Sequence, residues 1–253
     1  MYLLIDAGNT RIKWGFHDGA RWLCREDLTH DALSTCDFAR FGEPSRVLVA
    51  HVASDAIRAL ILQQLGPWAA RAEWLVAGLQ RCGLTNRYAE PGRLGPDRWA
   101  AAIGAWHRVR GACVVVCAGT ATTVDAIDSG GNFLGGLILP GHGLMLRALA
   151  GGTAALPLAE GDCVAFPKNT HDAIETGIRY AQSGAVERFR QEMPQHTPVV
   201  LSGGSASALA PLIAPPRIDF PNLVLEGLLC VAREAQRGVE RRANPVQTRG
   251  VLE

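Results

Sequence analysis

LLIDAGNTRIKWGFHDG, residues 3–19, decides the fold of this 253-residue chain, because residues 114–131, VVVCAGTATTVDAIDSGG, repeat its pattern. Each stretch has an apolar run, a short turn with glycine and threonine, a second alternating run and another glycine turn. Apolar runs joined by such short turns predict β-hairpins. Two hairpins about half a chain apart predict a duplicated fold with a cleft between its halves.

The segments after the two hairpins also correspond. In each half the pattern predicts a third strand and then further helices and strands, the order of a ribonuclease-H-like half-domain. A purely alternating strand–helix fold is disfavoured, because only a tight turn joins the first two strands. We therefore predict an α/β protein of two tandem ribonuclease-H-like domains of the actin-like ATPase fold, each a mixed sheet with flanking helices. The predicted domains are residues 1–111 and 112–253.

The individual elements follow from local patterns. The predicted strands span residues 2–6, 10–17, 22–26, 46–51, 73–76, 113–118, 122–128, 133–138, 198–202 and 223–225. The predicted helices span residues 31–41, 54–65, 97–109, 141–150, 171–192, 205–213 and 226–239. Two segments that contain glycine and proline, 78–96 and 151–168, are predicted loops.

Composition limits the classes of function. Apolar residues make up 48% of the chain and charged residues 19%, which suits a packed core. The net charge of +1 gives no reason to expect nucleic acid or an anionic membrane as a partner, and no apolar run approaches the span of a bilayer. Seven cysteines without a C-x-x-C pair disfavour a zinc site or disulfide framework and fit a reducing cytoplasm.

The two glycine–threonine turns predict a site for phosphate groups. Glycine leaves backbone N–H groups open and threonine adds a hydroxyl donor, so facing turns would cradle a nucleotide triphosphate. Asp6 ends the first strand and would hold Mg²⁺, while Lys13 could reach a β- or γ-phosphate. Asn9 and Thr10 could donate to phosphates. The alternative is that both are ordinary structural turns.

Two further segments carry candidate chemistry. GPDR, residues 95–98, opens a helix, so Asp97 suits a general base and Arg98 could pair with a substrate carboxylate. Read from physics alone, a helix-start acid beside a solvated arginine is the stronger interpretation. The glycines of SGGS, Gly203 and Gly204, allow either close approach of an adenosine or a tight strand-to-helix turn. Asp125 could face the cleft or cap a neighbour.

Together these motifs resemble the type III pantothenate kinase family. The pattern comprises DAGNT (6–10), GPDR (95–98), AGTATTVD (118–125), GGLILPG (135–141), KNT (168–170) and LSGG (201–204), in the family's order over about residues 1–230. The resemblance implies ATP-dependent phosphorylation of pantothenate at its primary hydroxyl. The product would be 4′-phosphopantothenate, in the first step towards coenzyme A.

The resemblance also implies roles for individual residues. It places the ATP phosphates against residues 6–13, with Mg²⁺ near Asp6, and it makes Asp97 the proton acceptor. Thr170 would contact substrate from the partner subunit of a homodimer. The residues implied to bind ATP are Asp6, Ala7, Gly8, Asn9, Thr10, Arg11, Ile12, Lys13 and Thr120; those implied to bind pantothenate are Tyr88, Gly95, Pro96, Asp97, Arg98 and Thr170.

One position departs from the family pattern. The family usually has an aspartate at the start of the second turn, where it helps bind a monovalent cation, K⁺ or NH₄⁺. Cys117 stands there in this chain. A neutral thiol is a poor ligand for a hard cation, so either the cation dependence is lost or another oxygen donor, such as Asp125 or a backbone carbonyl, takes the place.

Two alternatives stay open. A sugar or acetate kinase on the same fold is disfavoured by the short chain and the GPDR segment. A non-catalytic ATP-binding accessory factor of a transcriptional regulator is the second alternative. The presence of Asp6, Lys13 and Asp97 together favours catalysis, because a purely scaffolding protein would have no use for all three together.

Overall fold

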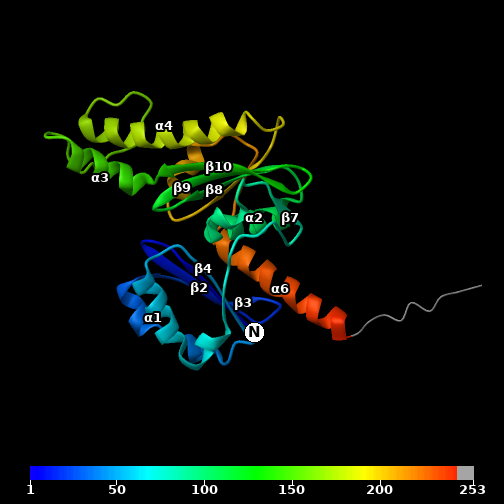
Figure 1. The fold of residues 1–253 in the computed structure, drawn as a ribbon. Coiled ribbons are helices and arrows are strands. Elements are labelled where there is room, and N and C mark those ends of the chain that lie inside the picture. The colour runs from blue at the N-terminus through cyan, green and yellow to red at the C-terminus, as the bar shows by residue number, and fades with distance from the viewer. Residues whose placement is uncertain (244–253) are drawn as a thin grey trace, which may run out of the picture.

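Two β-sheets with a pair of helices between them form the computed structural model of the chain, which describes residues 1–243 (Figure 1). The first sheet has the strand order β3-β2-β1-β4-β5 and the second β12-β11-β8-β9-β10-β7-β6. The first-sheet strands are β1 (Tyr2–Ala7), β2 (Arg11–His17), β3 (Trp22–Thr29), β4 (Arg46–His51) and β5 (Ala72–Trp74). The second-sheet strands are β6 (Gln80–Arg81), β7 (Leu84–Asn86), β8 (Cys113–Ala118), β9 (Ala121–Ile127), β10 (Asn132–Pro140), β11 (Val199–Ser202) and β12 (Arg217–Asp219).

The two sheets repeat one topology. In the first, β1, β2 and β3 form an antiparallel meander, and β4 and β5 add in parallel beside β1. In the second, β8, β9 and β10 form the meander, and β11 and β12 add in parallel beside β8. This repetition confirms the predicted pair of ribonuclease-H-like sheets of the actin-like ATPase fold.

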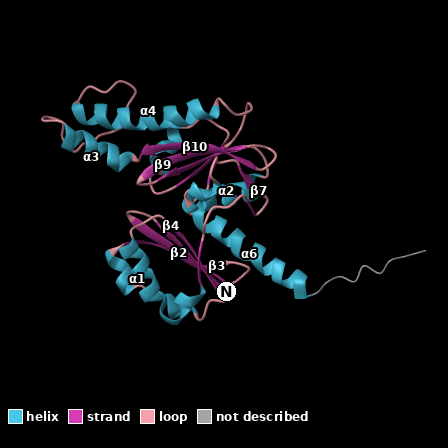
Figure 2. Cartoon of the chain, in the orientation of Figure 1, coloured by secondary structure: helices cyan, strands magenta, loops and turns pink. Residues whose placement is uncertain are grey.

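Helices lie on the outer face of each sheet and between the two sheets (Figure 2). The helices are α1 (Asp55–Leu65), α2 (Pro96–Val109), α3 (His142–Gly152), α4 (Thr170–Arg190), α5 (Ala206–Leu209) and α6 (Leu223–Ala243). Helix α1 packs on the outer face of the first sheet, α4 on the outer face of the second, and α2 and α6 lie between them. No helix within residues 1–243 is both long and apolar enough to cross a bilayer.

The central strands β1 and β8 are buried on both faces, and the largest core lies between the sheets. Leu3 of β1 joins the outer core beneath α1, whereas its neighbour Leu4 joins the central core. Val114 of β8 joins the outer core beneath α4, and Val115 points to the centre. Because α2 and α6 contribute side chains to the same central core, this core ties the two sheets together.

Helices α2 and α6 cross with their backbones in contact. A side chain at Gly227 of α6 would overlap the carbonyl oxygen of Ala100 in α2. A Cβ atom at Gly104 of α2 would stand 2.7 Å from the carbonyl oxygen of Leu223. Both glycines are buried, so any larger residue at the crossing must push the helices apart.

Three predicted elements are wrong. Residues 31–41 form two 3₁₀ turns instead of one helix, because the side chain of Asp37 accepts the N–H of Ala39 and restarts the turn. Residues 78–96 are not wholly a loop, since β6 and β7 are strands too short to show a period. Residues 223–225, predicted as a strand, begin α6, and the strand lies earlier, at β12. A short apolar run is equally compatible with a buried strand and with a buried helix.

The domain boundary at residue 111 stays a prediction. Strands β6 and β7 come from the first predicted domain, yet β7 pairs with β10 in the second sheet. Residues 244–253, which the second predicted domain includes, lie outside the described residues.

We expect Gly227→Ala to lower the free energy of unfolding by about 2–4 kcal/mol, because the added methyl group must separate α2 from α6. Urea denaturation of the two proteins measures the difference. The matched control is Gly184→Ala, an exposed position in α4 with open space around it. Gly184→Ala should raise the free energy of unfolding by up to about 1 kcal/mol. Equal effects of Gly184→Ala and Gly227→Ala would contradict the close contact of the two helices.

Candidate functional site

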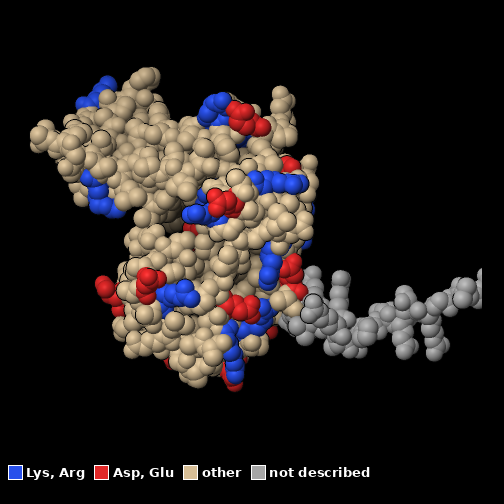
Figure 3. Space-filling view, viewed as in Figure 1, with Lys and Arg blue, Asp and Glu red and all other residues tan. Residues whose placement is uncertain are grey.

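A cleft of about 410 Å³ lies where β1, β8 and β11 end, between the two sheets. The face of the molecule in Figure 3 is hollowed between its two lobes, and charges of both signs are interspersed on it. The lining includes the predicted residues Asp6, Gly8, Asn9, Thr10, Arg11, Lys13, Asp97, Arg98, Thr120, Gly203 and Gly204, and also Cys117. Residues far apart in the sequence therefore share one cavity.

The two glycine–threonine turns meet across this cleft. The hydroxyl oxygens of Thr10 and Thr120 are hydrogen-bonded at 2.7 Å, although 110 positions separate them in the chain. Each turn is closed by a single backbone bond, from Gly8 N to Arg11 O (3.1 Å) and from Gly119 N to Ala121 O (3.0 Å). The other amide groups of the turns are left for a ligand, which suits the oxygens of a polyphosphate.

Asp6 has the environment of a cation ligand. Its carboxylate makes no hydrogen bond or ion pair with another residue of the described chain, and Lys13 stands opposite it in the β1–β2 register. Burial and the charge of Asp97 raise the pKa of Asp6 to about 7, against the opposing charge of Lys13. Such an uncompensated carboxylate fits a divalent cation.

A magnesium ion at Asp6 would need most of its ligands from elsewhere. Within residues 1–243 no three His, Cys, Asp or Glu side chains cluster in a way that could hold a metal ion. Mg²⁺ usually binds through one or two carboxylates, phosphate oxygens and water. The donor set therefore fits an ion carried by a bound nucleotide better than an ion held by the protein alone.

The start of α2 presents Asp97 and Arg98 to the cleft. Burial raises the pKa of Asp97, although backbone N–H groups and Arg98 lower it, so this carboxylate is a better proton acceptor than an exposed one. Arg98 is 5% exposed and forms a buried ion pair with Asp125 of β9, with Nε 3.2 Å from both carboxylate oxygens. Its guanidinium also lies 5.8 Å from the ring centre of Tyr88.

The ion pair shows whether Asp125 faces the cleft or caps a neighbouring residue. The carboxylate is 1% exposed and engages Arg98, and burial raises its pKa to about 6 against the opposing effect of that arginine. Gly136 of β10 lies against the pair, where a Cβ atom would overlap the Asp125 carboxylate. Asp125 therefore caps Arg98 and does not line the cleft.

The SGGS turn forms the wall beside β11. Gly203 has φ +105°, and a side chain there would overlap the backbone of Ala118, so the turn needs glycine for its own packing. Gly204 has open space around its Cα atom. The first residues of α6, together with Asn222, complete this wall. Gly203 thus serves the tight turn, and Gly204 leaves room for a ligand.

Several predicted site residues lie outside the lining of the cleft. Ala7 and Ile12 are buried in the outer core of the first sheet. Tyr88, Gly95 and Pro96 lie next to Asp97 and Arg98 without lining the cavity. Thr170, at the start of α4, lines a separate groove of about 900 Å³ between α3 and α4.

Cys117 occupies the end of β8 and lines the cleft. Burial and the nearby carboxylates raise the pKa of its thiol well above the ordinary value. The group is therefore an uncharged thiol at neutral pH, which supports the view that it does not bind a hard cation.

Part of the lining was not predicted from the sequence. Asp27 of β3 lies opposite Lys13 in the strand register and pairs with Arg11 at 2.5 Å, a contact that period-two alternation could have indicated. Helix α3 contributes Gly143, Leu144 and Arg147. Nothing local in the sequence distinguishes these from other surface residues of a helix. Val52 and Asn222 to Val224 were also not predicted. The remaining lining residues belong to the AGTATT and SGGS segments that the sequence already indicated: Gly119, Ala121, Thr123, Ser202 and Ser205.

This pair of sheets around a cleft with two facing phosphate-type turns defines a member of the actin-like ATPase superfamily. Solved structures agree on the fold. A Campylobacter jejuni protein described as a conserved putative Baf family transcriptional activator has a TM-score of 0.63 at 21% identity, covering 93% of this chain and 99% of that one. Component A of (R)-2-hydroxyglutaryl-CoA dehydratase from Acidaminococcus fermentans has a TM-score of 0.55 at 12% identity, over 94% and 98%.

The family follows from the sequence comparison. A family profile for type III pantothenate kinase matches residues 2–192. The type III pantothenate kinase of Aromatoleum aromaticum is 48% identical over 92% of this chain and 98% of its own length. That of Dechloromonas aromatica is 47% identical over 90% and 97%. The chain belongs to the type III pantothenate kinase family.

We expect Asp6→Asn to stabilise the ligand-free protein by about 1–2 kcal/mol at neutral pH, a value reduced for the solvent in the cleft. The pKa of Asp6 is raised from 3.8 to about 7 on folding. Between these values the unfolded chain is ionised at this site and the folded protein is not. Unfolding therefore releases a proton, and wild-type stability falls as the pH rises through the window. The asparagine variant loses this dependence.

Urea denaturation across that pH range measures the difference between the two proteins. The advantage of the variant should be small near pH 4 and complete above pH 7. The control is Asp31→Asn, because Asp31 is exposed and does not line the cleft. An advantage that stays constant across the range would contradict the assigned cause.

Proposed function

We propose that this protein transfers the γ-phosphoryl group of ATP to the primary hydroxyl of pantothenate, giving 4′-phosphopantothenate for coenzyme A synthesis. The observation that carries the proposal is the contact of Thr10 with Thr120, which sets two phosphate turns beside Asp97. Relatives that match nearly the whole chain are named type III pantothenate kinase, and this supports the choice of acceptor.

The residues of the cleft divide the work of phosphoryl transfer. The amide groups of the two turns and the ammonium group of Lys13 hold and orient the phosphates. Asp6 would hold Mg²⁺, which when bound neutralises charge on the transferred group. Asp97 accepts the proton of the attacking hydroxyl. Arg98 lines the acceptor side and, held by Asp125, fixes the start of α2.

The alternatives from the sequence find less support. Asp6, Lys13 and Asp97 all line the one cleft, an arrangement that a non-catalytic accessory factor would not need. The likeness to a described transcriptional activator, at 21% identity, speaks for the shared fold alone. A different kinase of this fold would have to phosphorylate another acceptor, which competition with sugars or acetate tests directly.

We also propose that the enzyme is a homodimer, with a second copy covering the groove between α3 and α4. Small apolar side chains are exposed along this groove, those of Ala148, Ala173 and Ala181, and Phe166 beside it is 86% exposed. Apolar surface of this kind usually marks a protein interface. Thr170 lies on the groove, so dimerisation would bring it to a substrate site near the interface.

A cytoplasmic location is part of the same proposal. None of the seven cysteines, all of which lie within residues 1–243, forms a disulfide bond, which fits a reducing compartment.

We expect purified protein with Mg²⁺ and ATP to convert pantothenate into phosphopantothenate, and Asp97→Asn to lose at least about a hundredfold in kcat. Mass spectrometry of the product and a coupled ADP assay measure both. Because the pKa of Asp97 is raised by burial, wild-type activity should fall as the pH drops through that pKa. No product from wild type would refute the kinase, whereas a fully active variant would refute only the assignment of the base.

The same assay tests the cation. Rates in K⁺, NH₄⁺ and Na⁺ buffers should be similar if the neutral Cys117 thiol has removed the monovalent site. A strong preference for K⁺ would show that other oxygen donors have replaced the aspartate.

We expect wild type to sediment as a dimer and Ala181→Glu to sediment as a monomer, because a buried unpaired carboxylate at this interface would be costly. Ala181 lines the groove and is exposed in the single chain, so the change leaves the core of the protein intact. Analytical ultracentrifugation measures the mass, and Val76→Glu, at a position 70% exposed and outside the groove, is the control. A monomeric wild type would refute the dimer.

A further inference from the structure

His30 holds the first phosphate turn from outside the cleft. Its Nε2 atom lies 3.0 Å from the carbonyl oxygen of Gly8 in that turn. A carbonyl oxygen only accepts, so Nε2 carries a hydrogen and donates. Gly8 and Asn9 line the cleft, whereas His30 is half-buried and lies outside the lining. A ring in this place acts on a ligand only through the turn.

This contact takes the place of the bond that usually closes a tight turn. In a β-turn the first carbonyl oxygen often accepts the N–H of the residue three positions further on. Here the backbone bond runs the other way, from Gly8 N to Arg11 O, and no backbone N–H within residues 1–243 donates to Gly8 O. The side chain of His30 is therefore what holds this carbonyl group.

The second phosphate turn is held at the equivalent place by a backbone group. The N–H of Gly141 donates to Thr120 O at 2.9 Å. Gly141 directly follows β10, as His30 directly follows β3. Strands β3 and β10 are the third strands of the two meanders, and each pairs with the strand that leaves the phosphate turn. Each turn thus has one carbonyl group held by the residue after the third strand of its own sheet.

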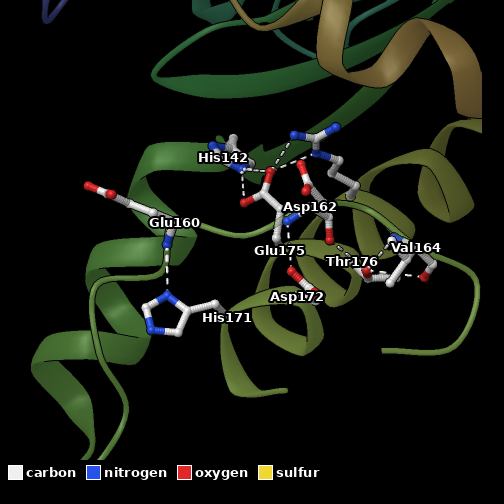
Figure 4. Close-up of polar contacts among 9 residues, drawn as sticks. His142, Glu160, Asp162, Val164, His171, Asp172, Glu175 and Thr176 are labelled. Atoms are coloured by element: carbon white, nitrogen blue, oxygen red, sulfur yellow. Dashed lines mark hydrogen bonds and ion pairs between the residues drawn. The ribbon is translucent and has the colours of Figure 1, made fainter. Parts of the chain in front are cut away.

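The support of the second turn is anchored in α4. Figure 4 shows His142 beside Glu175, with Nε2 2.8 Å from Oε2, and Glu175 is 4% exposed. The buried side chain of Gln182 donates to Pro140 O at 3.0 Å. The chain is therefore fixed on both sides of Gly141, where a side chain would overlap the backbone of the second turn. Only the first turn can be released by a substitution that the fold accepts.

Holding the Gly8 carbonyl group sets the direction of the next N–H. The peptide group is planar and trans, so the N–H of Asn9 points away from the Gly8 oxygen and from His30. Within residues 1–243 this N–H has no hydrogen-bond partner. The backbone of His30 is fixed in turn, because its carbonyl oxygen accepts the N–H of Leu33 at 3.2 Å, and Leu33 is buried in the outer core of the first sheet.

The Asn9 amide is suited to a phosphate oxygen. A donor that is fixed before the ligand arrives loses little freedom on binding, and such preorganised donors stabilise the charge that moves in phosphoryl transfer. We propose that His30 is a positioning residue that holds the Gly8–Asn9 peptide with its N–H towards the phosphate groups of ATP, an inference that rests on the proposed function. A peptide released from His30 can rotate, and a carbonyl oxygen turned towards the cleft repels phosphate.

Three substitutions at residue 30 test the role of the donor. His30→Gln keeps an N–H at nearly the reach of Nε2, His30→Asn is one methylene shorter, and His30→Leu has no donor. His30→Leu and His30→Asn should each raise KM for ATP about 3- to 10-fold, as expected for loss of one net hydrogen bond. KM for pantothenate should stay within about twofold, and His30→Gln should stay close to wild type.

Calorimetric titration with Mg²⁺ and the non-hydrolysable analogue adenylyl imidodiphosphate measures binding apart from turnover. His30→Leu and His30→Asn should bind the analogue about 3- to 10-fold more weakly than wild type. This result is expected even if the protein transfers no phosphoryl group to pantothenate, so the two failures are distinguishable. The control is Asp31→Asn, since Asp31 directly follows His30, is exposed and does not line the cleft; it should change neither affinity nor KM.

Unaltered affinity and KM for the nucleotide in His30→Leu would overturn the proposal, as would a wild type that does not bind the analogue. Equal rises in both KM values would indicate a general disturbance of the cleft and also overturn it. Equal losses in all three variants would assign the effect to the ring and not to its N–H. Urea denaturation checks the fold of each variant, and His30→Asn carries the test if His30→Leu does not fold.

Discussion

The close crossing of α2 and α6 is the constraint on which the site depends. Because their backbones touch at Gly104 and Gly227, the two helices hold the sheets at one separation. The start of α2 delivers Asp97 to the cleft, and the start of α6 forms the wall beside the SGGS turn. The proposed proton acceptor and the proposed nucleoside wall are thus placed by the same contact, which makes the cleft a consequence of how the core packs.

The carboxylates in and beside the cleft differ in whether an ion pair compensates their charge. Asp125 is fully buried and has its own cation in Arg98. Asp6 and Asp97 have no such partner, and burial raises the pKa of both. Unpaired buried carboxylates are costly in the empty protein, so a bound cation and a substrate hydroxyl can relieve a cost that the fold already carries. The residues that weaken the free protein are thus the ones that we propose to bind its ligands.

The sequence indicated the duplicated sheets and the two glycine–threonine turns that line the cleft, because hairpins and glycine turns are local features. It could not show that Asp125 faces Arg98, since this pairing depends on how α2 packs beneath β9. It also missed α3, whose cleft residues Leu144 and Arg147 look like an ordinary helix surface. The 3₁₀ turns at 31–41 were not predicted because a local bond to the Asp37 side chain, which leaves no periodic signal, restarts the turn. The strands at 80–86 were not predicted because they are too short to show a period.

The pairing of β7 with β10 bears on how the chain is synthesised. Leu84 is buried in the finished protein, but its partner strand begins only at Asn132. A nascent chain that has emerged as far as α2 therefore carries β7 without the strand with which it pairs in the second sheet. The amino-terminal sheet can close on the ribosome while residues 80–86 wait for later sequence. The two halves, alike in topology, are consequently unequal as folding units: the first cannot be separated from the second without leaving an edge exposed to aggregation.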